Sequence, residues 1–150
     1  MDTILVNNIE DVARSRLVTI GADATLADVA KLLPAAKVSL VVVCHSDRVM
    51  AGVVTKSDVV RQIGHYPQSV CTTTAADVMT RDVTCCRMGD TLENVLTVMN
   101  ERGLEHIPVI DDTSIPSGVV DARDALKALM AQANYNEALL RDYVMGVGYR

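Results

Sequence analysis

The chain has 150 residues, a length that fits one compact domain with a hydrophobic core. Its formal net charge is −5 and its basic residues form no cluster, which argues against binding to duplex nucleic acid or to anionic membranes. No apolar run reaches the roughly 18 residues that a membrane-spanning helix needs. The N-terminus lacks a secretory pattern and the four cysteines form no CxxC motif, so we expect a cytoplasmic protein.

One sequence unit occurs twice in the chain, offset by 66 positions. Residues 11–61 align with residues 77–127 without a gap, and Gly52 and Asp58 fall on Gly118 and Asp124. A repeat of this length is a supersecondary unit rather than one rung of a solenoid. Two such units commonly pack about a pseudo-twofold axis, so we expect ligand sites in the clefts between them.

The hydrophobic pattern predicts the same order of elements in both units: strand, helix, strand, strand, helix. In the first unit these elements are a strand at 17–20, a helix from Thr25 that ends near Pro34, strands at 38–43 and 50–55, and a helix at 57–63. In the second unit they are a strand at 83–86, a helix from Thr91 that ends near Gly103, strands at 107–110 and 118–121, and a helix at 123–130.

These elements predict an α/β (α+β) fold made of two tandem repeats. We expect the first repeat with its N-terminal segment at 1–64, a linker at 65–74, the second repeat at 75–130 and a helical tail at 131–150. The tail carries part of an amphipathic stripe, with Leu139, Leu140, Tyr143 and Val144 on it. It is expected to pack on its own domain or on a second subunit.

Several fragments, in the same order and at constant spacing, resemble the CBS (cystathionine beta-synthase) domain family across roughly residues 5 to 130. The fragments are Gly52-Val53-Val54-Thr55-Lys56-Ser57-Asp58 with its copy at 118–124, the opening Asp77-Val78-Met79-Thr80, and a middle strand within 103–111. The resemblance implies a tandem CBS pair, or Bateman module, with two clefts. Such clefts take adenosine-containing ligands, namely AMP, ADP, ATP, NAD(H) or S-adenosylmethionine, and many such modules form homodimers.

The residues themselves point to a ligand at Thr55 and Asp58, where a strand runs directly into a helix. A helix N-terminus attracts anions such as phosphate, and a carboxylate in the first turn can accept ribose hydroxyl groups. The alternative is that Thr55 simply caps the helix and Asp58 is its capping partner. The duplicated context favours the ligand over the cap.

The resemblance assigns further residues to each cleft. The Asp58 cleft would contain Leu40, Val53, Thr55, Ser57 and Asp58, with Gly89 and Leu104 from the second repeat. Lys56 departs from the family pattern and is expected to supply a point charge there. The Asp124 cleft would contain His106, Val119, Asp121, Arg123 and Asp124, with Asp23 and Val38 from the first repeat.

The two clefts are expected to differ, because Asp121 stands where the family usually has Thr or Ser and Glu105 adds a second carboxylate. Carboxylates beside a phosphate are unfavourable, although Arg123 and His106 offset part of this. We therefore predict tighter ligand binding in the Asp58 cleft. The Asp124 cleft is expected to be empty, to take an uncharged nucleoside or to need a divalent cation. Lys56-Ser57 replaces the Glu-Arg of many relatives, which weakens the expected phosphate contacts.

No catalytic or metal-ligating constellation occurs in the sequence: there is no P-loop, no G-x-S-x-G and no HExxH. We therefore expect a regulatory module, not an enzyme, that requires no cofactor and senses an adenine nucleotide or related adenosine ligand, with an unknown protein partner. The alternative is a structural dimerisation module with vestigial clefts. A small redox or metal enzyme built on Cys85-Cys86 ranks last, because these thiols lie in an apolar strand and a disulfide between neighbours is strained.

Overall fold

The computed structural model describes residues 3–36 and 39–134. Within those ranges no helix combines the length and the apolar character needed to cross a membrane. The elements of the first half are η1 (Val6–Ile9), α1 (Glu10–Ser15), β1 (Thr19–Gly21), α2 (Leu26–Ala36), β2 (Leu40–Cys44), β3 (Met50–Thr55) and α3 (Lys56–His65). Those of the second half are η2 (Pro67–Ser69), α4 (Ala75–Val78), α5 (Leu92–Arg102), β4 (His106–Ile110) and β5 (Pro116–Asp121), and a helix at 122–134 follows.

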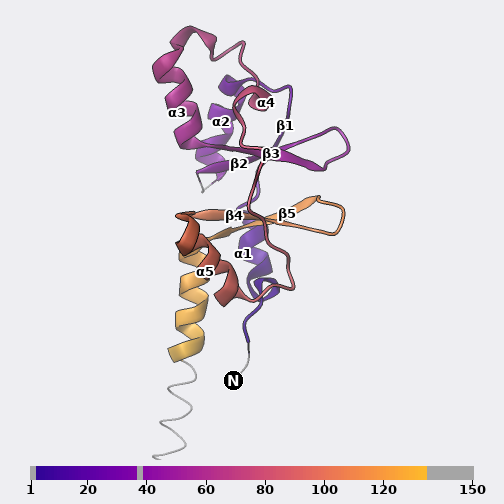
Figure 1. Ribbon diagram of the computed structural model, residues 1–150, viewed down its shortest axis with the longest axis vertical. Helices are drawn as coiled ribbons and strands as arrows, with labels where there is room; N and C mark the ends of the chain where they lie inside the picture. Colours follow the sequence, from indigo (N-terminus) through magenta and orange to yellow (C-terminus); the bar gives the residue numbers. More distant parts are fainter. Residues whose placement is uncertain (1–2, 37–38, 135–150) are drawn as a thin grey trace, which may run out of the picture.

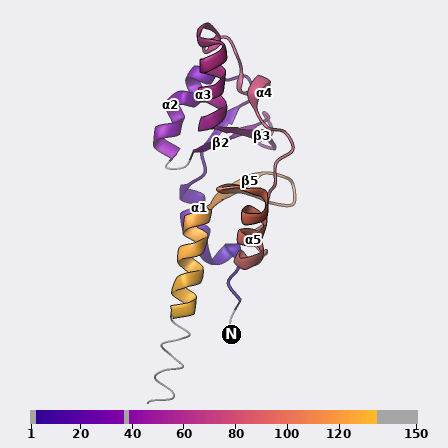
Figure 2. The ribbon, with the colours of Figure 1, turned by 60° about the vertical axis from the view of Figure 1, so that its left-hand side comes forward.

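The two halves repeat one another with the offset of 66 residues seen in the sequence. β2 and β3 form an antiparallel pair with Val42 opposite Val53, and β4 and β5 form the same pair with Pro108 opposite Val119. α2 and α5 precede these pairs, and α3 and the helix at 122–134 follow them. The predicted α/β architecture of two tandem repeats is confirmed, and Figures 1 and 2 show one repeat above the other.

The first strand of the unit differs between the halves. β1 pairs in parallel with β2 and completes a three-stranded sheet. The strand predicted at 83–86 is wrong, since only an isolated bridge joins Cys86 to Val109. The cause is Pro108: its counterpart Val42 donates a backbone hydrogen bond to Val18, and a proline has no N–H to donate.

The ends of the two long helices also differ. α5 ends at Gly103, whose φ of 66° lies in the left-handed region that glycine adopts readily, as predicted. α2 was expected to end near Pro34, but it continues to Ala36. A proline removes the hydrogen bond of its own nitrogen and leaves the donors that follow it intact, so the last turn persists.

The short leading helices of the two repeats are exchanged. α1 packs against β5 of the second repeat, and α4 packs against β3 of the first, an arrangement visible in both ribbon views (Figures 1 and 2). Glycines allow this close approach. A Cβ on Gly52 would lie 2.5 Å from the Thr80 carbonyl oxygen, and one on Gly118 would lie 3.0 Å from the Ala13 backbone. Each sheet is therefore covered by a helix from the other repeat.

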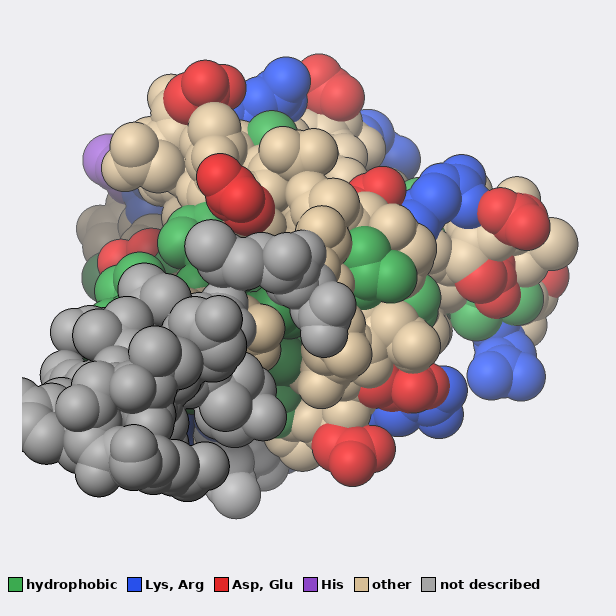
Figure 3. All heavy atoms as spheres, turned by 90° about the horizontal axis from the view of Figure 1, so that it is seen from below, with side chains coloured by type: hydrophobic (Ala, Val, Ile, Leu, Met, Phe, Trp, Pro, Cys, Tyr) green, Lys and Arg blue, Asp and Glu red, His purple; other side chains and the backbone are tan. Residues whose placement is uncertain are grey.

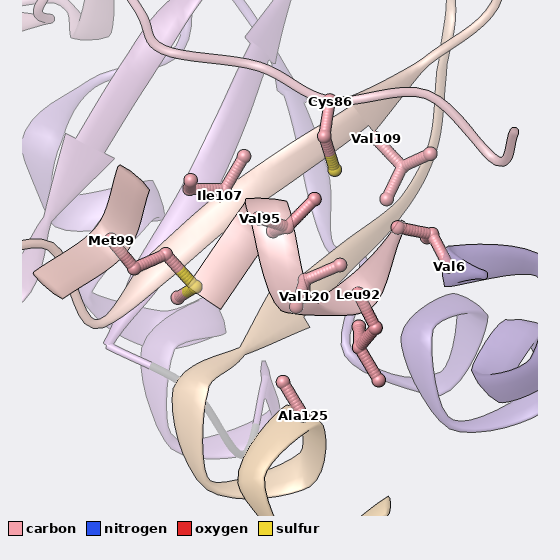
Figure 4. Close-up of a cluster of buried hydrophobic side chains, with 9 residues drawn as sticks. All are labelled: Val6, Cys86, Leu92, Val95, Met99, Ile107, Val109, Val120 and Ala125. Atoms are coloured by element: carbon pink, nitrogen blue, oxygen red, sulfur yellow. The ribbon is translucent and has the colours of Figure 1, made fainter. Parts of the chain in front are cut away.

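Among the described residues, the hydrophobic core has three parts. One lies within the second repeat and takes in Val6 from the N-terminal segment (Figure 4). One lies within the first repeat and takes in Ala75 and Met79 from the second. The third joins the two sheets and is formed by Leu40, Val42, Val53 and Val119. The third cluster fixes the two repeats face to face, which positions the space at the ends of their strands.

Surface charge is mixed. On the face drawn in Figure 3, acidic and basic side chains lie interspersed rather than gathered by sign. The tail expected at 131–150 is described only to residue 134, where it continues the helix that begins at 122. The predicted stripe from Leu139 to Val144 lies outside the described residues.

Candidate functional site between the repeats

The start of α3 shows the capping geometry that the sequence allows. The backbone N–H of Thr55 donates to Asp58 Oδ2 at 2.9 Å, and the backbone N–H of Asp58 donates to Thr55 Oγ1 at 3.2 Å. Asp58 Oδ1 has only a 3.5 Å contact with the exposed Arg61. The capping alternative is therefore present in the structure, and one oxygen of the carboxylate is left with a single weak partner among the described residues.

A cavity of about 350 Å³ lies beside this helix start and between the repeats. Leu40, Val53, Thr55 and Ser57 line it from the first repeat, together with Ser39. The second repeat supplies two segments, Thr80, Asp82, Val83 and Thr84 before α5 and Gly103, Leu104, Glu105, His106 and Pro108 around the start of β4. The cavity thus combines aliphatic walls with a helix N-terminus.

A larger hollow of about 830 Å³ lies next to the first, and both are lined by Ser39, Glu105 and His106. Ala30, Leu33 and Pro34 of α2 form its apolar wall. Its charged residues are Lys56, Glu105, Asp121 and Arg123. Two of these are basic and two acidic, so the hollow has a mixed electrostatic character.

The structure brings together most of the predicted site residues but not all of them. Leu40, Val53, Thr55, Ser57, Leu104 and His106 line the smaller cavity, and Lys56, His106, Asp121 and Arg123 line the larger one. Asp58, Asp124 and Val119 line neither of these two cavities, and Val119 is fully buried in the core between the sheets. Val38 lies outside the described residues.

Asp23 and Gly89 also line neither cavity. The residues on either side of Asp23 bond to the backbone of Ala75 and Ala76, and the residues on either side of Gly89 bond to Val6 and Asn7. Both predicted residues therefore lie beside the exchanged N-terminal segments of the repeats. The segment at 80–84 takes the place in the cavity that was expected for Gly89.

Asp121 is buried, and its charge is fully partnered. Its Oδ1 accepts the backbone N–H of Arg123 at 2.7 Å, and Arg123 Nε and Nη2 lie 3.2 and 3.1 Å from the carboxylate. His106 Nε2 lies 3.2 Å from Oδ2. Burial alone raises the pKa of this carboxyl, but the hydrogen bonds and charge of Arg123 and the charge of His106 outweigh it, so the pKa lies below its usual range.

Asp124 is held by a residue from the other repeat. Arg16 Nε and Nη2 donate to its two carboxylate oxygens, each at 3.0 Å. This bidentate hydrogen bonding raises the pKa of the Arg16 guanidinium. The sequence interpretation missed Arg16, although the 66-residue offset pairs it with Asp82, which lines the smaller cavity.

The cysteines and acidic residues form no metal centre in the described ranges, where no cluster of three His, Cys, Asp or Glu side chains suits a metal ion. All four cysteines are free. Cys86 is buried, and desolvation raises the pKa of its thiol to about 12. Such a thiol is unreactive at neutral pH.

The family model of the CBS domain matches this chain twice, at residues 9–65 and 75–131. Among curated proteins, inosine-5'-monophosphate dehydrogenase of Methanocaldococcus jannaschii is 26% identical over 122 residues, which are 81% of this chain and 23% of that enzyme. The chain spans about a fifth of the length of the first curated relatives that it matches.

Solved structures share the fold. The CBS domain pair of protein MJ0100, in complex with 5'-methylthioadenosine and S-adenosyl-L-methionine, has a TM-score of 0.73 at 19% identity, over 87% of this chain and 99% of that one. CBSX2 of Arabidopsis thaliana in complex with AMP has a TM-score of 0.74 at 20% identity, over 87% of this chain and 98% of that one.

Proposed function

Because the chain belongs to the CBS domain family, we propose that it is a regulatory module that binds an adenosine-containing metabolite between its repeats. The observation that carries the proposal is the 350 Å³ cavity at the start of α3, to which both repeats contribute. A ligand there touches both halves and favours one arrangement of them, which a partner protein can read. The match to the dehydrogenase covers under a quarter of that enzyme, so it carries no catalytic activity to this chain.

The walls of the cavity suit a nucleoside. Leu40, Val53 and Leu104 offer aliphatic surface for adenine, which takes the place of aromatic stacking in a chain with no Phe and no Trp. Thr55 and Ser57 stand at the helix N-terminus and bring their hydroxyl groups to the cavity. The backbone N–H groups of Thr55, Lys56 and Asp58 already donate within the chain, which leaves that of Ser57 for a polar ligand. Asp58 lies in the same first turn of α3, and its Oδ1, which has only the weak contact with Arg61, suits a ribose diol.

The charges favour a neutral ligand, or one that carries positive groups beside a carboxylate, over a polyphosphate. Asp82 and Glu105 line the smaller cavity, and no Lys or Arg is among its described lining residues. The larger hollow balances Lys56 and Arg123 against Glu105 and Asp121. An ammonium and a carboxylate on one ligand match this balance, whereas three phosphates meet two carboxylates. We therefore propose the affinity order S-adenosylmethionine, then AMP, then ATP.

Calorimetric titration with S-adenosylmethionine, AMP, ATP and NADH tests the proposal. Binding is expected for at least the first, with a rise in thermal stability worth about 2.7 kcal/mol at a ligand concentration 100-fold above Kd. Asp58→Ala is expected to weaken binding at least tenfold.

Asp28→Ala provides the matched control. Thr25 and Asp28 form the same reciprocal cap at α2, with hydrogen bonds of 3.2 and 3.3 Å. The start of α2 contributes no residue to either cavity, whereas Thr55 and Ser57 at the start of α3 line the smaller one. Loss of this cap is expected to cost about 1 kcal/mol of stability without a change in Kd. Equal loss of affinity in both variants, or no response of the wild type to any ligand at millimolar concentration, would refute the proposal.

A second candidate function is dimerisation without ligand binding, and exposed apolar side chains support it. Val60 and Ile63 on α3 are 59% and 40% exposed, and Leu126 and Met130 on the helix at 122–134 are 49% and 56% exposed. These two helices are equivalent in the two repeats, so their apolar faces suit a second copy of the chain. Val60→Asp combined with Leu126→Asp is expected to convert a dimer to a monomer in light scattering, and a wild-type monomer would exclude this function.

A further inference from the structure

The ion pair between Arg16 and Asp124 joins positions 108 residues apart in the chain. Its side chains are only 21% and 15% exposed. Arg16 caps the C-terminus of α1, and its backbone N–H contacts the carbonyls of Val12 and Ala13. Because α1 packs against β5 through Ala13 and Gly118, the guanidinium is held in place by the exchange of the leading helices.

The internal repeat shows what this ion pair replaces. The offset of 66 residues places Asp124 on Asp58 and Arg16 on Asp82. Asp82 lines the open cavity between the repeats, whereas Arg16 lines neither of the two cavities and instead donates two hydrogen bonds to Asp124. Both oxygens of the Asp124 carboxylate are therefore held by a guanidinium, whereas Oδ1 of the equivalent Asp58 has only the 3.5 Å contact with Arg61.

Asp121 places a carboxylate at the helix N-terminus of this cleft, just as Arg16 places a guanidinium at Asp124. It stands at the start of the helix at 122–134, at the position of Thr55, and its Oδ1 accepts the backbone N–H of Arg123 at 2.7 Å. A helix N-terminus that already holds a buried carboxylate has less attraction for an external anion. The positive and the negative elements that a nucleotide would need are thus both satisfied from within the chain.

We propose that Arg16 and Asp121 are built-in ligands of the Asp124 cleft, so that each chain binds one adenosine ligand and Arg16 determines this stoichiometry. The inference rests on the proposed function only for the ligand of the Asp58 cleft. Removal of Arg16 opens a second site. That site takes neutral adenosine rather than AMP, because it holds three carboxylates, those of Asp121, Asp124 and Glu105. Only two cations, Lys56 and Arg123, oppose them.

Calorimetry with adenosine and AMP as probes tests the inference on the full chain. The wild type is expected to bind one adenosine, and Arg16→Ala two. The added site binds AMP at least about tenfold more weakly than adenosine. Arg16→Ala combined with Asp124→Ala returns the stoichiometry to one, and Arg16→Ala combined with Asp58→Ala keeps the added site alone.

Arg14→Ala controls for the loss of a positive charge from the same helix, since Arg14 is exposed and pairs with Glu10. It is expected to leave one site. If Arg16→Ala does not fold, as judged by circular dichroism, Arg16→Ser serves for the same titrations.

Each outcome is decisive. Two sites in the wild type, or one site in both the wild type and the folded Arg16 variant, would overturn the inference while leaving the proposed function intact. A wild type that binds nothing, beside an Arg16 variant that binds one adenosine, would support the inference and refute the proposed function. Failure of the variant to bind either probe would overturn the inference.

Discussion

The two repeats share their backbone arrangement and differ in the side chains of their clefts. Their sheets pair in the same register around equivalent positions. In the clefts, however, the position of Asp82 in one repeat is that of Arg16 in the other, and Thr55 corresponds to the buried Asp121. Positions that set strand pairing and helix packing have kept their character since the duplication. Positions at the clefts differ in charge: Asp82 corresponds to Arg16, which is paired with Asp124, and Ser57 corresponds to Arg123.

The largest expected effect tests whether the hydrophobic cores of the two repeats contribute equally to stability. Leu26 and Leu92 occupy the same position in the two repeats, and both side chains are fully buried. Leu26→Ala and Leu92→Ala should each lower the free energy of unfolding by about 2–5 kcal/mol, because each leaves a cavity in one core. Urea denaturation measures both free energies. A loss below about 1 kcal/mol for one variant only would show that the two cores do not contribute equally.

The glycines under the exchanged helices should distinguish the repeats. A Cβ on Gly52 would lie 2.5 Å from a backbone oxygen, whereas one on Gly118 would lie 3.0 Å or more from the Ala13 atoms nearest to it. We expect Gly52→Ala to cost about 2–3 kcal/mol and Gly118→Ala about 1 kcal/mol, since overpacking forces backbone shifts. The same urea assay checks this, and a reversed order would contradict the packing described for α4 and α1.

Asp121 should make the stability of the second repeat depend on pH. Thr55 cannot do this in the first repeat, because its side chain carries no titratable group. Because the folded-state pKa of Asp121 is lowered, its stabilisation is fully present above the unfolded pKa of about 3.9 and is lost as the pH falls through the lower folded value. At pH 7 Asp121→Asn should cost about 1 kcal/mol, the difference between a charged and a neutral hydrogen bond. Below about pH 4 this difference from the wild type should shrink.

Urea midpoints measured from pH 7 to pH 3 test this dependence. Asp11→Asn removes an exposed carboxylate from α1 and serves as the control. A cost for Asp121→Asn that is constant over the whole range would mean that the charge of Asp121 contributes nothing to stability.

The smallest effect concerns thiol reactivity. Cys86 stands at the position of Ile20 and is buried with a thiol pKa of about 12, whereas Cys71 is exposed. Iodoacetamide at pH 8 should therefore modify Cys71 first and Cys86 only after unfolding. Mass spectrometry of the peptides measures the order. Rapid labelling of Cys86 in the native chain would show that the core of the second repeat opens without global unfolding and would contradict this order.

Local signals in the sequence predicted the elements well where one residue type decides the conformation. The strand at 50–55 has the predicted bounds, and Gly103 ends α5 in the left-handed conformation that glycine favours. The strand at 83–86 failed because the hydrogen bond that it needs depends on Pro108, which is distant in sequence and has no N–H. Strand formation here is a property of the pair, not of either segment.

The candidate site was predicted in part for the same reason. The residues at the start of α3 were found because a strand, a cap and a helix follow each other directly in the sequence. The segment at 80–84 and Arg16 were missed, since they reach the clefts only through the exchange of α1 and α4 between the repeats. No local pattern marks that exchange, although the 66-residue offset relates Arg16 to Asp82 once either is known.

The exchange of α1 and α4 between the repeats also determines what proteolytic cleavage does to this protein. A protease cut in the connection at 65–74 would leave two fragments, each carrying the helix that covers its neighbour's sheet and missing the one that covers its own. Neither fragment would be a domain that folds alone. When the two fragments associate, however, each supplies the helix that the other lacks, so together they should restore the fold.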